Sequence, residues 1–282
     1  MMNRTGLKRR EFLRKSSLGM AAMALPSQVS GASAESQAFS FAQISDTQLG
    51  FGGYELDLQK FRQAVKQINA LQPDFVVICG DLVDKANDQS FADFLSIKEG
   101  FEIPCYCAAG NHDIGNEPTE ESLKRYRTVI GEDYYSFEHK GKTIATVNTQ
   151  LWKSPLVGEA EEHDRWFENM LRDAAEKNSP VFVFGHYPLF LKTPDEEEGY
   201  FNLPIEKRRK LLNQFEKHGV VAMLGGHAHK LIINDHQGIQ LVNAETTSKN
   251  FDSRPFGFRL WHVDQTRPYA CDFVGLEGFN KG

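Results

Sequence analysis

The sequence predicts an α/β protein in which two mixed β-sheets pack face to face between outer helices, a four-layer αββα sandwich. Two observations predict this fold. In the first half of the chain, apolar runs of strand length alternate with helical patterns, which indicates parallel βαβ units. In the second half, strand patterns follow one another with fewer helices, which indicates a second sheet packed on the first.

The first half supplies the alternating elements. Residues 39–45 are the first expected strand, and residues 75–79 (FVVIC) form a continuous apolar run typical of a strand buried on both faces. The helix between them shows apolar side chains at the spacing of one helix face: Leu58, Phe61, Val65, Ile68 and Leu71. A helix at about 89–99, a strand at 103–109 and a helix at about 119–130 follow.

The second half begins with an expected hairpin over 134–149 that turns at Lys140-Gly141. The elements that follow are a loop (150–158), a helix (about 159–177), a strand (181–185), an acidic and proline-containing insertion (193–204), a basic helix (about 205–218) and strands at 220–225, 231–235, 239–244, 257–263 and 269–274. No stretch between residues 39 and 275 has the composition of a linker. We therefore expect one domain, residues 35–282.

Residues 1–34 have the organisation of a secretory signal. A basic segment with Arg9-Arg10 precedes Phe12-Leu13, a short apolar run follows, and the small-residue sequence GASA ends at Ala34. The arginine pair resembles a twin-arginine signal, which directs folded proteins to the twin-arginine export machinery. This interpretation predicts a periplasmic or extracellular protein. A disordered basic tail with a chance arginine pair is the alternative.

The charge of the chain limits its partners. Residues 1–34 hold six of the 32 Lys and Arg and one of the 38 Asp and Glu, so the formal charge of residues 35–282 is −11. A strongly acidic body argues against a nucleic-acid-binding surface. The sequence also contains no apolar run long enough to span a membrane in the expected mature chain. An anionic substrate must therefore be attracted by a local positive centre.

Metal-binding residue types follow five of the expected strands at the point where each ends. They are Asp46 and Gln48, Gly80-Asp81, Gly110-Asn111-His112-Asp113, Gly185-His186, and Gly226-His227-Ala228-His229. Each motif alone is also compatible with an ordinary polar turn or a loop histidine. Functional groups of α/β sheets collect at the carboxyl ends of strands, so all five together predict one metal centre.

These motifs resemble those of the calcineurin-like metallophosphoesterases, whose pattern is Asp-x-His, Gly-Asp, Gly-Asn-His-Asp/Glu, Gly-His and Gly-His-x-His. The segments GNHDIGNEPT, DYYSF, HYPLFL and YFNLP further resemble the subgroup of calcineurin-like phosphoesterase domain-containing proteins. The resemblance spans nearly all of residues 40–275. It implies the αββα sandwich and two divalent metal ions.

The resemblance also implies residue roles. Asp81 would bridge the two metals, His112 would act as general acid, and Asp113 would orient the ring of His112. The remaining ligands would be Asp46, Gln48 and His229 at the first site, and Asn111, His186 and His227 at the second.

The implied reaction is hydrolysis of a small phosphomonoester by a hydroxide held between the two metals. A phosphodiesterase acting on nucleotides or phospholipid headgroups is the enzymatic alternative, and a non-catalytic binding protein on the same fold is the third hypothesis. Among Mn, Fe, Zn and Mg, the carboxamide of Gln48 favours oxygen-preferring Mn²⁺ or Mg²⁺, and we expect Mn²⁺. Asp84 stands where the purple, iron(III)-using branch has tyrosine, which disfavours that iron site.

Three segments are candidate walls for a substrate: Trp152-Lys153, residues 195–200 and the turn at Arg254. Functional loops collect at the face where strands end, which favours such a role. Packing of Trp152, solvation of the acidic run and a local turn role for Arg254 are the alternatives. The basic stretch 207–210 is expected to be the solvent-facing side of its helix.

Overall fold

The computed structural model describes residues 37–279. The expected signal, residues 1–34, lies outside the described residues. Among the helices that the structure describes, none is long and apolar enough to cross a membrane.

The first sheet has five strands in the order β11-β10-β1-β2-β3. Their bounds are β1 (Phe39–Ile44), β2 (Phe75–Cys79), β3 (Cys105–Ala108), β10 (Gly257–Val263) and β11 (Ala270–Gly275). Strands β1, β2 and β3 are parallel, with Phe41 opposite Phe75 and Val76 opposite Cys105. β10 runs antiparallel to both β1 and β11. The sheet is therefore mixed, with the parallel strands that the sequence pattern indicates on one side.

The second sheet has six strands in the order β4-β5-β6-β7-β9-β8. Their bounds are β4 (Tyr135–His139), β5 (Lys142–Thr146), β6 (Val181–Phe184), β7 (Val220–Gly225), β8 (Ile232–His236) and β9 (Ile239–Asn243). The four central strands are parallel, and β4 and β8 pair antiparallel at the two edges. The expected hairpin β4-β5 and a second hairpin, β8-β9, thus close the edges of one mixed sheet.

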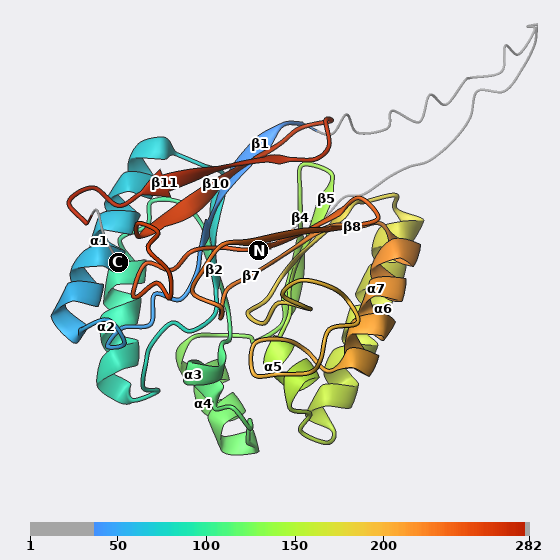
Figure 1. Cartoon of the computed structure of the whole chain (residues 1–282), viewed down its shortest axis with the longest axis horizontal. Helices are drawn as coiled ribbons and strands as arrows, with labels where there is room; N and C mark the ends of the chain where they lie inside the picture. Colours follow the sequence, from blue (N-terminus) through green and yellow to red (C-terminus); the bar gives the residue numbers. More distant parts are fainter. Residues whose placement is uncertain (1–36, 280–282) are drawn as a thin grey trace, which may run out of the picture. The chain divides into compact units, whose positions relative to one another are not determined.

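Helices cover the outer face of each sheet (Figure 1). Helices α1 (Tyr54–Leu71) and α2 (Asp88–Lys98) lie on the side of the first sheet, and α6 (Glu159–Glu176) and α7 (Ile205–His218) lie on the side of the second. The shorter helices are α3 (Asn111–Ile114), α4 (Glu120–Val129) and α5 (Thr149–Lys153). The expected loop 150–158 therefore begins with a helical turn, and the motif Gly110 to Asp113 contains one.

The alternation of side chains along β2 shows why four layers form. Phe75, Val77 and Cys79 lie in the core between the two sheets, whereas Val76 and Ile78 pack in the core shared with α1 and α2. A strand with apolar side chains on both faces needs a covering layer on each. A third core joins the second sheet to α6 and α7. These three cores make the αββα sandwich that the sequence predicts.

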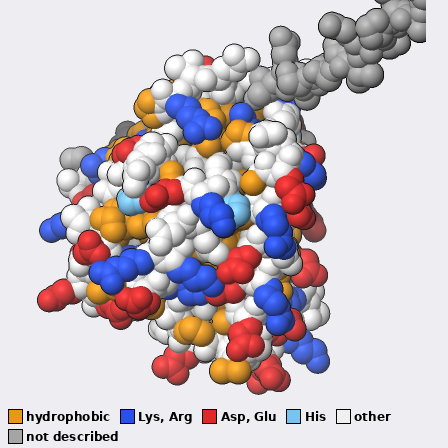
Figure 2. All heavy atoms as spheres, turned by 90° about the vertical axis from the view of Figure 1, so that its right-hand side faces the viewer, with side chains coloured by type: hydrophobic (Ala, Val, Ile, Leu, Met, Phe, Trp, Pro, Cys, Tyr) orange, Lys and Arg blue, Asp and Glu red, His pale blue; other side chains and the backbone are white. Residues whose placement is uncertain are grey.

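The basic stretch of α7 is one side of an ion-pair network with α6. Lys207 Nζ lies 2.8 Å from Asp164 Oδ2, and Lys210 Nζ lies 3.0 Å from Glu168 Oε1. Figure 2 shows this face, on which Lys and Arg are interspersed with Asp and Glu. Lys207 and Lys210 thus lie on the polar side of α7, as expected, and α6 balances their charge. The expectation is wrong for Arg208, which is fully buried and donates from Nε to the carbonyl oxygen of Leu203 at 2.6 Å.

His163 of α6 is a fully buried histidine away from the strand ends. Its Nε2 accepts a hydrogen bond of 3.3 Å from the backbone N–H of Asn148, and aromatic rings of Tyr134, Trp152 and Trp166 surround it at centroid distances of 4.9 to 5.9 Å. Burial lowers the pKa of His163 to about 4. The imidazole is therefore neutral in the folded protein at neutral pH.

We expect this histidine to make the fold sensitive to acid. Between pH 6.5 and about pH 4 the unfolded chain binds a proton here that the folded protein does not, so stability falls as the pH falls. The loss is about 2 kcal/mol at pH 5 relative to pH 7. Urea unfolding at both pH values should show a weaker pH dependence in His163→Gln, whose amide oxygen can still accept the Asn148 bond. The exposed His262→Gln should behave as wild type; equal pH dependence in all three proteins would contradict the prediction.

Candidate metal centre

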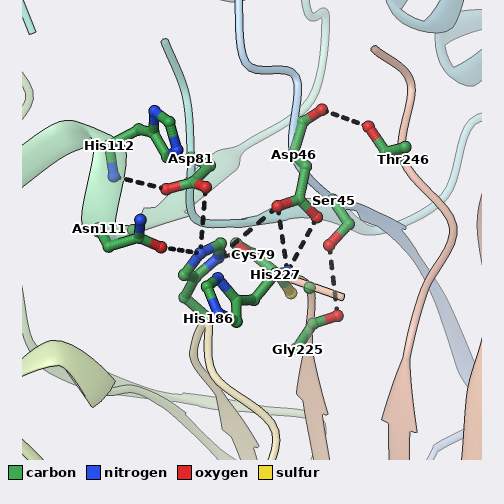
Figure 3. A network of polar contacts seen from close by, with 12 residues as sticks. Ser45, Asp46, Cys79, Asp81, Asn111, His112, His186, Gly225, His227 and Thr246 are labelled. Atoms are coloured by element: carbon green, nitrogen blue, oxygen red, sulfur yellow. Dashed lines mark hydrogen bonds and ion pairs between the residues drawn. The ribbon is translucent and has the colours of Figure 1, made fainter. Parts of the chain in front are cut away.

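Five strand exits deliver the expected ligand residues to one place (Figure 3). The exits follow β1, β2, β3, β6 and β7, whose carboxyl ends lie at the same edge because these strands are parallel within their sheets. Asp46, Asp81, Asn111, His186 and His227 lie together, with His112 beside them. His229 lies within ligand spacing of Asp46 and Asp81, and the backbone N–H of Gln48 donates to the carbonyl oxygen of Asp81 at 2.8 Å. The two sheets thus contribute to the site together.

Two groups of these side chains have the spacing of metal ligands. Asp81, His186 and His227 form one group, and Asp46, Asp81 and His229 form the other, with the ligand atoms of each group within 4.8 Å of one another. All five residues are buried. Asp81 belongs to both groups, which is the position that a bridging carboxylate requires.

The backbone at the ligand positions is strained. Asp46, Gln48, Asp81, His227 and His229 have φ values of 49°, 32°, 48°, 66° and 49°, in the left-handed region that side chains rarely adopt. They are five of the nine non-glycine residues with positive φ in residues 37–279. Such conformations persist where the surrounding structure imposes them, and they collect at functional sites.

Two glycines allow the strand exits to meet. A Cβ at Gly110 would lie 2.8 Å from Cα of Asp81 and nearer still to its backbone nitrogen, and a Cβ at Gly226 would lie 2.5 Å from Asp46 Oδ2. These contacts are with backbone or with a buried carboxylate, so the clash could not be relieved by a flexible side chain. The glycines that precede the motifs therefore permit close approach between strands.

Backbone and hydroxyl donors fix the two carboxylate residues. The backbone N–H of His227 donates to Asp46 Oδ1 at 3.0 Å, and the hydroxyl of Thr246 donates to the carbonyl oxygen of Asp46 at 2.6 Å. The backbone N–H of His112 donates to Asp81 Oδ1 at 2.8 Å. Each carboxylate thus keeps a defined orientation while retaining oxygen atoms that face the histidines.

Each of the three histidines is oriented by a backbone carbonyl. His186 Nδ1 lies 2.8 Å from the carbonyl oxygen of Cys79, His229 Nδ1 lies 2.6 Å from that of Lys249, and His227 Nε2 lies 3.2 Å from that of Tyr200. A nitrogen that donates to a carbonyl leaves the other ring nitrogen unprotonated and available to a metal. The other ring nitrogen of His186 lies 3.3 Å from Asp81 Oδ2 and 3.1 Å from Asn111 Oδ1, and that of His229 lies 3.5 Å from Asp46 Oδ1.

The electrostatics of the site favour bound positive charge. Burial raises the pKa of Asp46 above its ordinary value. Burial also opposes ionisation of Asp81, but the charge and hydrogen bond of His186 hold the pKa of Asp81 below its ordinary value. Burial lowers the pKa of His227, and nearby His186 lowers it further, so His227 is neutral. Burial opposes the charged form of His186, but the carboxylate of Asp81 raises the pKa of His186 to about 9. Metal ligation requires the neutral imidazole, so a cation bound here would take the place of that proton. Buried carboxylates and imidazoles form the donor set of a divalent cation.

Gln48 fits the ligand role that the resemblance implies. Its side chain is 1% exposed, and its Oε1 has no hydrogen-bond partner among the described residues. A buried amide oxygen without a partner is costly unless a cation or other ligand satisfies it. The donor set therefore fits two cations, with Gln48 beside the group that contains Asp46 and His229.

We expect Gln48→His to tighten binding of metal at this first site. Imidazole is a stronger donor than a neutral amide oxygen for most divalent transition metals. The gain should be roughly 10-fold in affinity for Zn²⁺, similar to the effect of other changes close to metal ligands. Calorimetric metal titration of the metal-free protein measures it, with Gln67→His, a half-buried position on α1 outside the site, as control. Unchanged first-site affinity would contradict the assignment.

The structure corrects the expected role of Asp113. Its carboxylate accepts hydrogen bonds from the backbone N–H groups of Gly110 at 2.8 Å and Leu82 at 2.9 Å, so it joins two strand exits. His112 is oriented by Asp84 instead: Nδ1 of His112 lies 2.9 Å from the carbonyl oxygen of Asp84 and 3.4 Å from its carboxylate Oδ1. The reason is that α3 begins at Asn111 and turns the Asp113 side chain inward. Asp84 follows Asp81 by three residues, but that spacing alone does not indicate a contact with His112.

The candidate substrate walls differ in what they contact. Trp152 is 1% exposed and donates from Nε1 to Asp164 at 2.9 Å, so it packs. Lys153 Nζ donates to the carbonyl oxygen of Asn202 at 2.7 Å and thereby supports the insertion. Arg254 lies 3.3 Å from Asp252 and 3.6 Å from Glu245, near the end of the loop that follows β9. The insertion is the segment that reaches the site, through Tyr200.

Two ligand groups that share one buried carboxylate, at the strand ends of an αββα sandwich, define a hydrolase with a dinuclear metal centre. The sequence profile of the calcineurin-like phosphoesterases matches residues 39–231. The chain belongs to this family and is a metal-dependent hydrolase of phosphate esters.

Three proteins show what this chain is similar to within and around the family. It is 36% identical to the serine/threonine-protein phosphatase CPPED1 of Danio rerio over 86% of this chain and 88% of the relative. It is 27% identical to a probable glycerophosphodiester phosphodiesterase, GpdQ, of Arcobacter nitrofigilis over 67% of this chain and 71% of that one. The crystal structure of a dimetal phosphatase from Danio rerio has the same fold, with a TM-score of 0.62, 17% identity and coverage of 84% and 96%.

Proposed function

We propose that the protein hydrolyses a phosphomonoester at the centre built around Asp81. The observation that supports this most is the sharing of Asp81 between the two ligand groups, with His112 bound to Asp81 through its backbone N–H. Asp46, Gln48 and His229 would hold the first cation, and Asn111, His186 and His227 the second. Two divalent cations, when bound, supply Lewis-acid charge and lower the pKa of water.

The protein's own groups then have separate tasks. Asp81 and Asp46 fix the positions of the cations, because hydrogen bonds hold both carboxylates. His112 gives a proton to the leaving oxygen, since its Nδ1 is held by Asp84 and its Nε2 remains free. Asp84 holds the ring of His112 in place, and Asp113 maintains the approach of the strand exits.

We further propose Mn²⁺ as the preferred metal at the first site. The carboxamide oxygen of Gln48 and the carboxylates of Asp46 and Asp81 are oxygen donors, which Mn²⁺ accepts more readily than Zn²⁺ does. Metal content after purification from Mn-supplemented and Zn-supplemented cultures would test this preference.

The name of the CPPED1 relative supports a monoester substrate. The GpdQ relative supports the alternative, a phosphodiester with a polar headgroup. Assays with p-nitrophenyl phosphate and bis-p-nitrophenyl phosphate, with Mn²⁺ supplied, separate the two. We expect faster turnover of the monoester. Preference for the diester would favour the alternative, and hydrolysis of neither would exclude an enzyme of this class.

We also propose that the protein is exported through the twin-arginine pathway, which rests on the sequence around Arg9-Arg10. Arg9→Lys combined with Arg10→Lys should retain the protein in the cytoplasm of a bacterium that has this pathway. Arg4→Lys combined with Arg14→Lys changes the same number of arginines outside the pair and should leave export intact. Equal export of both variants would contradict the proposal.

A further inference from the structure

An arc of four aromatic side chains lies against the metal-centre histidines. The arc consists of Phe51, Phe251, Phe201 and Tyr200, whose ring centroids are 6.1, 6.4 and 5.0 Å apart in that order. The residues come from three separate segments: the turn after β1, the loop after β9 and the insertion after β6. The fold thus brings them together around one site.

Each ring of the arc contacts a histidine of the centre. Phe251 stacks on His229 with a centroid distance of 4.5 Å and an interplanar angle of 11°, and Phe51 lies 5.3 Å from the same ring. Tyr200 and Phe201 lie 4.8 and 5.4 Å from His227. The arc therefore follows the motif that supplies ligands to both metal sites.

The arc is partly open to solvent, because Phe51 and Phe201 are half-buried whereas Phe251 and Tyr200 are exposed. Phe251 and Tyr200 are each 51% exposed, although they lie beside fully or nearly fully buried polar groups. Large exposed aromatic side chains that adjoin one another are unusual on a soluble protein surface and mark binding sites. The inner face of each of these two rings packs against the protein, whereas the outer face contacts solvent.

The insertion holds its part of the arc rigidly. The carboxylate of Glu196 accepts from the backbone N–H groups of Leu191 and Lys192 at 2.7 and 2.8 Å, and Arg208 Nη1 donates to the carbonyl oxygen of Glu196 at 2.9 Å. The amide of Asn111 donates to the hydroxyl of Tyr200 at 3.3 Å. Part of the acidic run thus accepts hydrogen bonds from the backbone of its own segment. These bonds hold the insertion's part of the arc in place before a ligand binds.

The arc is placed where the organic part of a phosphate ester must lie. The general acid protonates the leaving oxygen, so the group attached to that oxygen lies near His112. Phe51 is the arc member beside that residue, at a centroid distance of 6.2 Å. Phe251 continues the apolar surface from Phe51 along the first metal site.

The charge around the arc favours a neutral ring over a cation. Lys249 Nζ lies 5.4 Å from the centroid of Phe51 and makes the cation–π contact with that ring. A quaternary ammonium headgroup would be repelled by this lysine, whereas a neutral planar ring can stack on the exposed faces.

We propose that Phe51 and Phe251 select phosphate esters whose leaving group carries a planar aromatic ring, such as aryl phosphates or phosphotyrosine. This inference rests on the proposed phosphoesterase function of the same centre. Stacking of one ring contributes enough for roughly fivefold or greater discrimination against an alkyl group of the same charge.

The experiment measures binding without turnover. Calorimetry on the Mn-loaded protein compares phenylphosphonate with methylphosphonate, which share the phosphonate group and cannot be hydrolysed. We expect phenylphosphonate to bind about fivefold more tightly or better, and this ratio to approach one in Phe251→Ala and in Phe51→Ala. Ile233→Ala removes another exposed apolar side chain, on β8, and should keep the wild-type ratio.

A second arm compares kcat/KM for phosphotyrosine and phosphoserine in the same proteins, where the ratio of the two values cancels any general loss of activity. The ratio should fall about fivefold or more in both phenylalanine variants. Equal affinity of the wild type for the two phosphonates, binding of neither, or an unchanged ratio in both variants would overturn the inference. A phenylphosphonate preference without hydrolysis of either ester would overturn the proposed function and leave the inference standing.

Discussion

Replacing Asp81 by asparagine is expected to lower kcat/KM by roughly 10³-fold or more and to remove both metals from the purified protein. Asp81 is the one side chain that belongs to both ligand groups in residues 37–279. An amide has a single neutral oxygen donor and cannot bridge two cations or balance their charge. Even partners that only support a metal ligand contribute about 10- to 100-fold, so loss of the bridge should exceed that range.

Metal analysis together with p-nitrophenyl phosphate kinetics measures this effect. Asp133→Asn is the matched control, because Asp133 is also fully buried but lies 2.6 Å from Arg127 Nε away from the strand ends. We expect Asp133→Asn to lower thermal stability while retaining both metals. Retention of two metals per chain by Asp81→Asn would show that the bridge assignment is wrong.

The fold followed from the sequence because its strands differ sharply from their surroundings. The run 75–79 has apolar side chains on both faces, and only a strand between two covering layers uses both. The short helices α3 and α5 were not predicted, since segments of four and five residues have no helical periodicity to detect. The position of α3 depends on tertiary contacts such as the donation from the backbone N–H of Leu82 to the carboxylate of Asp113.

The metal ligands were also predictable, but their partners were not. The strand-exit rule places Asp46, Asp81 and the histidines at one edge without any knowledge of the strand order. The pairing of His112 with Asp84 depends on how the chain turns after β2 and on the direction of α3. The aromatic arc depends on three loops meeting, and sequence spacing carries no signal for that. Contacts between loops are thus the part of this site that required the structure.

The second large effect is expected for His112, the proposed general acid. Its Nδ1 is held by the carbonyl oxygen and carboxylate of Asp84, and its side chain is 30% exposed, so Nε2 can reach both a leaving oxygen and solvent. Positioned acids contribute about 10²- to 10⁴-fold when the leaving group needs a proton. We expect His112→Ala to lower kcat by about 10³-fold on an alkyl phosphate.

The dependence on the leaving group separates an acid from a merely structural residue. A 2,4-dinitrophenolate leaves without a proton, so the loss in His112→Ala should shrink to roughly 10-fold on that ester. Asp84→Asn should follow the same trend with smaller losses, because it weakens the hold on the ring and leaves the imidazole in place. Equal losses of His112→Ala on both esters, with metal content unchanged, would show that His112 does not supply the proton to the leaving oxygen. A loss confined to the alkyl ester would establish that Nε2 supplies the proton.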